Sequence, residues 1–348
     1  MHIMYPLDKF TSNAKYSPHT LMSYLKNSPA FYFPPVKGKY TVTAGLFALT
    51  HDFGNPLQDQ KIFQFDNQFT KYRKAKLSSR AENLAKYYCQ HLLADESRVS
   101  ACQFLINQLT LEYPAYFQQE TNKEGLRLTC LLTNELLTFD AHYNLLDDSR
   151  THAQPAYQDS IDALASQICE DIVIVEFDHQ QHWNALLHLC LPNHWSATDM
   201  AGQSFIKTHQ AVPGMENIFE NSHTLLSSIR RKGPYSRFAW GLSTDTRLNH
   251  HPQAPQNENP QLWKGRRFDK NAPELYLRVE RQTLFGLSNS KAIMFTIRTY
   301  HYDIQEDLNR KQRQQIASAI SDMGPQALEY KGLVEQKADI LDWLSTLI

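Results

Sequence analysis

Three charged residues on two predicted strands have the spacing of a polar site. Arg278 and Glu280 stand two residues apart in segment 275–283, where apolar and polar residues alternate, so both side chains should point to one side of a sheet. Arg298 has the equivalent polar position in segment 291–300 and could join them. Arginines beside an acid suit a ligand that bears carboxylates. The same pattern also fits a cross-strand ion pair on a solvated face, and the residues alone leave both interpretations open.

Histidines in the middle of the chain offer a second kind of chemistry. His188 lies on a predicted strand, whereas His194 and His209 lie in two segments bounded by Pro192 and Pro213. A neutral imidazole in this region could hold an iron, a zinc or a heme. A structural histidine with an ordinary hydrogen bond is the alternative at each position.

Other polar groups are interpreted as solvated surface. His250 and His251 fall in a Pro- and Asn-rich segment, 250–260, that predicts a surface loop, and Arg266 belongs to a short basic run, 264–267, without interleaved aromatic residues. The 35 basic and 36 acidic residues give a net charge of -1. Such a balance produces no field that would attract polyanions, so we expect neither a nucleic-acid nor a membrane partner.

Several common enzyme classes lack their motifs here. The sequence has no Gly-rich dinucleotide loop, Walker motif, HExxH, GxSxG or kinase set, and only 12 glycines. The five cysteines include no CxxC pair, which argues against an iron–sulfur cluster or a disulfide framework. If the protein does redox work, its electrons must arrive from another protein. Because nothing resembles a secretory signal or a membrane span, we expect a cytoplasmic location.

An antiparallel sheet with added helices should position these residues. We therefore predict an α+β fold in one domain, 1–348, with a mainly helical part (1–170), a mainly sheet part (171–305) and C-terminal helices (306–348). Apolar residues at helical spacing predict helices over 79–93, 99–111, 157–169 and 306–320. Alternating or β-branched segments predict strands over 39–44, 172–177, 183–191, 237–242, 275–283 and 291–300.

Longer segments of the sequence resemble one known family. The segments that carry the resemblance are Leu277 to Leu284, Ala292 to Tyr300, Leu191 to Trp195, Gly202, His209 to Gly214, Trp240 to Asp245, Asp66 to Lys76 and Tyr330 to Leu333. Together they are similar to the heme-dependent oxidative N-demethylase alpha subunit, from about Gly45 to Leu333. The chain departs from the family pattern at Thr208, where the family has Ile, and at Ala211 and Ser288, where prolines are expected.

The resemblance implies a fold and a reaction. It implies a PAS-like antiparallel sheet with helical elaborations that binds heme b. It also implies oxidation of a small methylated secondary amine, such as dimethylamine, with dioxygen and release of formaldehyde. In that family, separate reductase subunits with a flavin and an iron–sulfur cluster supply the electrons. The absence of both kinds of cofactor motif from this chain agrees with that division of labour.

The resemblance also orders the candidate site residues. His209 lies inside a matching segment and is the first choice for the axial iron ligand, with His194 and His188 as the alternatives. From polarity and strand position, Arg278 and Arg298 could pair with the heme propionates. Glu280 could hold a protonated amine or relay protons, and Trp240, in another matching segment, is the second candidate catalytic residue.

Two other functions fit the same sequence. The chain could be a non-catalytic heme-binding sensor or interaction subunit, because PAS-like folds commonly sense ligands and fold alone does not decide function. It could also bind another small molecule in place of heme.

Overall fold

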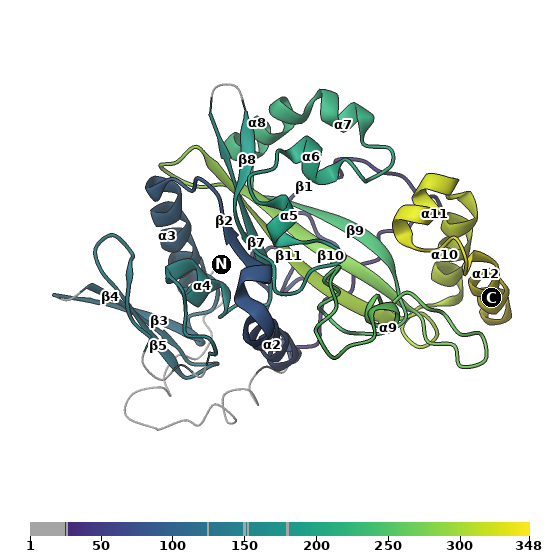
Figure 1. Ribbon diagram of the computed structural model, residues 1–348, viewed down its shortest axis with the longest axis horizontal. Helices are drawn as coiled ribbons and strands as arrows, with labels where there is room; N and C mark the ends of the chain where they lie inside the picture. The colour runs from purple at the N-terminus through teal and green to yellow at the C-terminus, as the bar shows by residue number, and fades with distance from the viewer. Residues whose placement is uncertain (1–24, 26, 124, 149–150, 152, 179–180) are drawn as a thin grey trace.

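The computed structural model describes residues 25, 27–123, 125–148, 151, 153–178 and 181–348 (Figure 1). Its larger sheet is antiparallel throughout and contains, in spatial order, β1 (Phe47–Ala48), β9 (Tyr235–Ser243), β10 (Tyr276–Gly286), β11 (Ala292–Asp303), β7 (Asp171–Phe177), β8 (His182–His188) and β2 (Tyr88–Gln90). A smaller antiparallel sheet contains β3 (Phe117–Asn122), β4 (Gly125–Cys130), β5 (Glu135–Phe139) and β6 (Leu145–Asp147). The predicted α+β class is confirmed.

Helices of very different length surround the larger sheet. Within the described residues they are α2 (Phe69–Tyr87), α3 (Asp95–Glu112), α4 (Ser160–Ala165), α5 (Ala197–Met200), α6 (Phe205–His209), α7 (Glu216–Glu220), α8 (Ser222–Lys232), α9 (Pro260–Trp263), α10 (Arg310–Asp322), α11 (Pro325–Lys331) and α12 (Lys337–Leu347). Local sequence sets several ends. For example, Asn309 and Gln312 form a capping box at the start of α10. Helices α10 to α12 lie at the opposite end of the molecule from the smaller sheet (Figure 1).

The long central strands give the larger sheet two chemically different faces. One face of β10 carries Leu277 and Val279, and we call it the core face; the other carries Arg278, Glu280 and Gln282, and we call it the polar face. Directly opposed residues in an antiparallel pair point to the same side, so the register extends both faces across the neighbouring strands. The alternation in the sequence therefore continues through three strands of the sheet.

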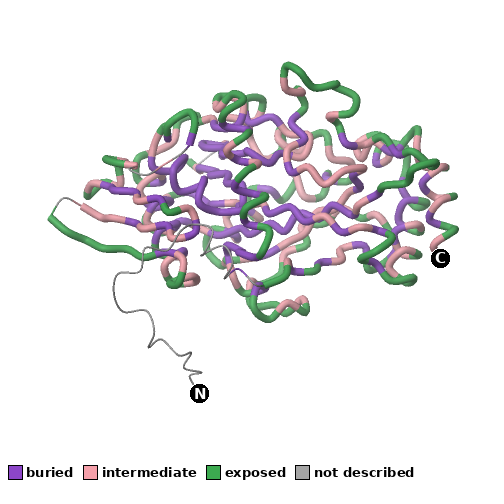
Figure 2. The backbone as a smooth tube through the Cα atoms, turned by 90° about the horizontal axis from the view of Figure 1, so that it is seen from below, coloured by how far each residue is buried: buried purple, intermediate pink, exposed green. Residues whose placement is uncertain are grey.

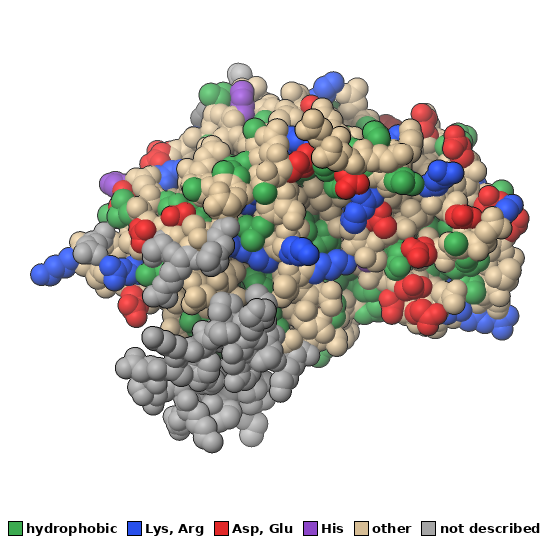
Figure 3. All heavy atoms as spheres, turned by 60° about the horizontal axis from the view of Figure 1, so that its bottom comes forward, with side chains coloured by type: hydrophobic (Ala, Val, Ile, Leu, Met, Phe, Trp, Pro, Cys, Tyr) green, Lys and Arg blue, Asp and Glu red, His purple; other side chains and the backbone are tan. Residues whose placement is uncertain are grey.

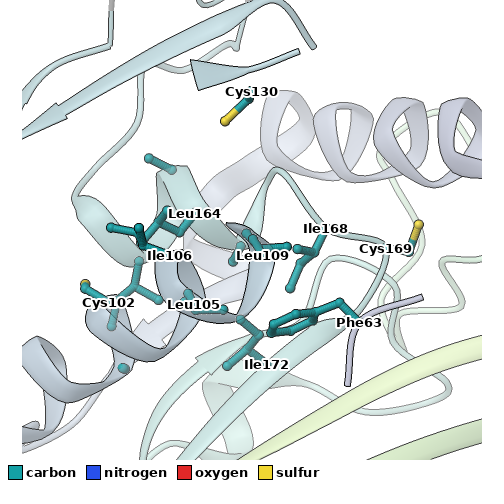
Figure 4. Close-up of a cluster of buried hydrophobic side chains, with 14 of the residues drawn as sticks. Phe63, Cys102, Leu105, Ile106, Leu109, Cys130, Leu164, Ile168, Cys169 and Ile172 are labelled. Atoms are coloured by element: carbon teal, nitrogen blue, oxygen red, sulfur yellow. The ribbon is translucent and has the colours of Figure 1, made fainter. Parts of the chain in front are cut away.

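The core face is covered by two groups of buried side chains. One group packs α10 and α12 against the ends of β10 and β11. The other joins α2, α3 and α4 to β7 and β8, and Figure 4 shows Leu105, Ile106 and Leu109 of α3 meeting Leu164 and Ile168 there. Buried residues accordingly run through the interior in Figure 2, with exposed segments outside. Burial of these apolar side chains is the main stabilising contribution to the fold.

Most strand predictions are confirmed, and several predictions for the first half are wrong. The hairpin β7–β8 and strands β9, β10 and β11 lie where the pattern predicts them, as do α3 and α10 within a few residues. The predicted helix over 79–93 begins earlier and ends at Tyr87, because Tyr88 to Gln90 pair with the edge of β8. Segment 39–44 is not a strand, helix 157–169 shortens to α4, and the smaller sheet was not predicted.

Surface properties agree with the balanced composition. In Figure 3, both acidic and basic side chains are scattered over the visible face. No helix in the described part of the chain is both long and apolar enough to cross a membrane.

Candidate functional site

Glu280 lies at the centre of the polar face and is held by two amides. Asn193 Nδ2 donates to Glu280 Oε1 at 3.0 Å, and Gln282 Nε2 donates to Oε2 at 3.1 Å. Glu280 is 9% exposed, and Arg278 Nη2 lies 4.0 Å from its Oε1. Because Arg278 and Glu280 are two residues apart on β10, they share the polar face as predicted. The carboxylate is thus oriented, and one side of it faces a buried arginine.

Three cationic side chains, Arg237, Arg278 and Lys331, interact with the charge of Glu280, and a fourth, Arg266, lies beside Arg278 and Lys331. Arg237 is on β9, opposite Gln282, and Arg278 is opposite Gly241. Lys331, the last residue of α11, reaches the same edge, where its Nζ donates to the Trp240 carbonyl at 2.6 Å. The fourth cation is Arg266, from the segment between α9 and β10, which packs beside Gly332. The cluster defined by Arg237, Arg266, Arg278 and Lys331 is called the cationic cluster below.

Burial disfavours the charged forms of these four side chains, and the pKa of each is lowered accordingly. Burial lowers the pKa of Lys331 to about 8 although Glu280 opposes the shift, and burial lowers the pKa of Arg266 to about 10. The pKa values of Arg237 and Arg278 are lowered by burial too, again against the attraction of Glu280. Glu280 is the carboxylate common to Arg237, Arg278 and Lys331, and Asp171 and Asp245 also act on Arg278, yet the pKa values of all three cations remain lowered by burial.

Unsatisfied hydrogen-bond donors coincide with these charges. Within the described part, Arg237 Nε and both Nε and Nη1 of Arg278 are buried and have no hydrogen-bond partner. A Cβ placed on Gly241 would meet nothing nearer than the Lys331 side chain at 3.9 Å. The Lys331 side chain therefore lies over Gly241, within ordinary van der Waals distance of such an atom. Such an arrangement suits a ligand that brings acceptors, above all carboxylates.

His209 approaches the same face from α6. Its Nδ1 lies 2.8 Å from the Phe205 carbonyl, so Nδ1–H donates there and Nε2 keeps its lone pair. Among the described residues, Nε2 has no hydrogen-bond partner. Trp195 and Phe205 flank the ring, with ring centroids at 6.0 Å and 4.3 Å. Burial first, and then the charge of Arg237, lower the pKa of His209 to about 4, which keeps the imidazole neutral.

The other two candidate histidines have different environments. His194 is half-buried beside Arg266 and Arg278, whose charges together with burial lower its pKa to about 2. His188 is fully buried on the core face, where its Nε2 lies 3.1 Å from Asp162. His188 is therefore separated from the polar face by the sheet, whereas His194 and His209 both border it.

The prediction that Arg298 joins Arg278 and Glu280 is wrong. Arg298 is opposite Arg281 on the core face, because it is out of phase with the residues that face Arg278. Its Nη2 contacts Asp66 at 2.6 Å, and its guanidinium lies over the rings of Tyr72 and Tyr300. Arg298 is 0% exposed, so it is a structural residue inside the protein.

Trp240 also points away from Glu280. It is opposite Val279, which belongs to the core face, and its ring packs edge-on against Tyr40 with centroids 5.9 Å apart. Only the backbone carbonyl of Trp240 takes part in the site, as the acceptor for Lys331. The structure does not bring the two predicted catalytic side chains together.

Several functional residues escaped the sequence interpretation. Arg266 and His250 were expected in solvent, yet Arg266 is half-buried in the cationic cluster and His250 is 1% exposed, with its Nε2 2.9 Å from Asp245. Neither Arg237 nor Lys331 belongs to a sequence motif that would mark it as a binding residue. The signal that could have found Lys331 and Asp245 is their position inside two of the family-like segments, Tyr330 to Leu333 and Trp240 to Asp245.

Fold and site together define an α+β protein with a cation-rich, histidine-bordered site on one face of an antiparallel sheet. A model of the family described as "Haem-dependent oxidative N-demethylase, alpha subunit-like" matches residues 54–341, which is more than half of the chain. The chain therefore belongs to this family, and the resemblance in its sequence is confirmed. The family description links its members to heme dependence.

Proposed function

We propose that the polar face binds heme b, with His209 as the iron ligand. The free Nε2 of His209 and the fixed Nδ1–H supply the donor and the tautomer that heme ligation needs. The unpartnered nitrogens of Arg237 and Arg278 would pair with the two propionates. In the described part, no group of three His, Cys, Asp or Glu residues could hold a bare metal ion, whereas a heme requires only one protein ligand. These propionate partners replace the predicted pair of Arg278 and Arg298.

The family description supports oxidative removal of an N-methyl group as the activity. We infer that the substrate is a small secondary amine of the dimethylamine type and that the product is formaldehyde. The reaction with dioxygen consumes an electron pair and two protons and forms water beside the aldehyde and the shortened amine. A bound heme iron would supply the activation of dioxygen. Electrons would come from separate flavin and iron–sulfur reductase subunits, as they do in the family that this chain resembles.

The chain's own residues have defined tasks in this reaction. Glu280 is the one carboxylate among the cations, so it would hold the ammonium form of the amine and take up its proton. Asn193 and Gln282 fix both carboxylate oxygens and thereby set the direction of that interaction. The cationic cluster would be neutralised by the propionates and would no longer repel the amine. The single observation that carries the proposal is this oriented acid beside unpartnered arginine nitrogens.

The activity is tested with hemin-loaded protein, a chemical reductant, air and dimethylamine. We expect formaldehyde release in the wild type and a loss of at least tenfold in Glu280→Gln, with the heme absorption band retained. Glu216→Gln, an exposed residue of α7, is the matched control and should leave release unchanged. A protein that keeps its heme band but forms no formaldehyde from any methylated amine would refute the enzymatic part and favour the sensor function.

A further inference from the structure

His194 has a backbone conformation that a non-glycine residue seldom adopts. Its φ of 62° lies in the left-handed region. Two backbone hydrogen bonds hold it there: His194 N–H donates to the His250 carbonyl at 3.0 Å, and His250 N–H donates to the Pro192 carbonyl at 2.8 Å. Strain of this kind persists only where the surroundings enforce it, and it concentrates at functional sites.

Neighbouring side chains hold the ring of His194 in place. The ring stacks on His250, with centroids 5.8 Å apart and planes at 24°. His250 Nε2 contacts Asp245 at 2.9 Å, and Arg247 Nε donates to the same carboxylate at 3.0 Å. Yet neither ring nitrogen of His194 has a hydrogen-bond partner among the described residues. The structure thus orients an imidazole and leaves its polar atoms unused.

Burial first, and then the surrounding charges, lower the pKa of His194 and keep its imidazole neutral. Arg266, Arg278 and Lys264 are the cations that act on it, and His250 stacks against it. Asn193, the residue before His194, donates a hydrogen bond to Glu280 on the polar face. A neutral imidazole carries one N–H donor, so it can donate a hydrogen bond without adding charge to the cluster.

Arg237 and Arg278, two cations of the polar face, act on His209 and His194 respectively. On the sheet, Arg237 is opposite Gln282 and Arg278 is opposite Gly241, so the pair Glu280 and Ala239 lies between them. At about 3.3 Å per residue, positions 237 and 241 on β9 are roughly 13 Å apart. The stretch of the polar face between these two arginines therefore includes Glu280, whose carboxylate accepts a hydrogen bond from Asn193, the residue before His194.

We propose that His194 donates a hydrogen bond to the small ligand that a heme bound on the polar face would take up. This assignment rests on the proposed heme site and adds a residue to it. His194 would be a catalytic residue, because it would touch the reacting ligand. Asp245 and His250 would be positioning residues that act through it.

Carbon monoxide is the probe, because its stretching frequency on ferrous heme falls when a donor contacts the bound molecule. The variants are His194→Asn, whose side chain tolerates the left-handed backbone but is shorter, and His194→Gln, whose longer amide can reach further. We expect the frequency to rise in H194N and to return part of the way in H194Q. His223→Leu, an exposed residue of α8, is the control and should match the wild type.

Three results would overturn the inference. An unchanged frequency in H194N with an intact heme band would refute the contact and leave the heme site standing. A low-spin, bis-histidine spectrum in the ferric wild type that is absent from H194N would show that His194 is itself an iron ligand. A wild-type protein without any heme band would refute both the proposed function and this inference.

Discussion

At the scale of single residues, two arginines with the same apparent pattern have opposite roles. Arg278 and Arg298 both lie on strands in which apolar and polar residues alternate, but the antiparallel register places them on different faces of the sheet. Arg298 is paired with Asp66, approached by Glu170 at 4.0 Å and covered by Tyr72. Arg278 keeps two nitrogens without a hydrogen-bond partner in the described part. Two nitrogens of Arg298 also lack a hydrogen-bond partner there, so the two arginines differ in their ion pairs: Arg298 lies 2.6 Å from Asp66, whereas Arg278 lies 4.0 Å from Glu280.

Arg298→Met should therefore destabilise the protein strongly. The substitution leaves Asp66 and Glu170 buried without their cation, and breaking a buried pair in this way costs about 3–5 kcal/mol. Urea unfolding measures the change. Arg278→Met is the matched comparison on the neighbouring strand and should cost less than half as much, because Arg278 lies 4.0 Å from its carboxylate partner, Glu280, whereas Arg298 lies 2.6 Å from Asp66. Equal losses in the two variants would contradict the assignment of structural and binding roles.

At the scale of elements, the strands were predictable and the helices less so. Segments 275–283 and 291–300 alternate over eight or more residues, and such a pattern has only one way to bury an apolar face. The predicted helix 79–93 overran because Tyr88 completes the sheet edge, a tertiary contact without a local signal. The smaller sheet was missed because β3 (Phe117–Asn122) is almost wholly polar and exposed. Its pairing depends on β4, and its own sequence does not indicate a strand.

The close contact between α8 and β10 depends on Gly286, a residue that has no side chain. A Cβ at Gly286 would lie 2.1 Å from the Arg230 carbonyl oxygen, so α8 can approach the strand only over a glycine. We expect Gly286→Ala to lower the free energy of unfolding by about 1–3 kcal/mol, measured by thermal or urea denaturation. Gly241→Ala is the control in the neighbouring strand, where the nearest atom would be 3.9 Å away, and it should change stability by less than about 1 kcal/mol. Identical stability of G286A and wild type would show that this approach is not tight.

At the scale of the whole molecule, the site is assembled from distant segments. Its residues come from the loop at Asn193, from α6, from β9 and β10, and from the C-terminal end of α11. Sequence reasoning found Arg278, Glu280 and His209, because strand phase and a family-like segment mark them. It could not find Arg237 or Arg266, since no local pattern records which residues the fold brings opposite a given strand. The single-domain organisation and the PAS-like topology stay predictions.

Close packing of the protein interior should protect the buried cysteine thiols from chemical modification. Cys102, Cys130, Cys169 and Cys190 are buried, and burial raises the pKa of each, to about 12 for Cys102. Because the thiolate is the reactive form, a disulfide reagent at pH 8 should modify no more than one thiol of the native chain, at the half-buried Cys89. All five should react in denaturant. Rapid modification of two or more native thiols would show that the interior opens readily.

The most direct test of the account is a titration of the purified protein with hemin, in which the absorption band of the bound heme is measured at each addition. We expect one heme per chain in the wild type and at least a tenfold loss of affinity, with a changed spectrum, in His209→Ala. Circular dichroism checks that the variant is folded, and H223A serves as the exposed control. A folded H209A protein that binds hemin with the wild-type spectrum and affinity would contradict the central claim that His209 holds the iron on the polar face.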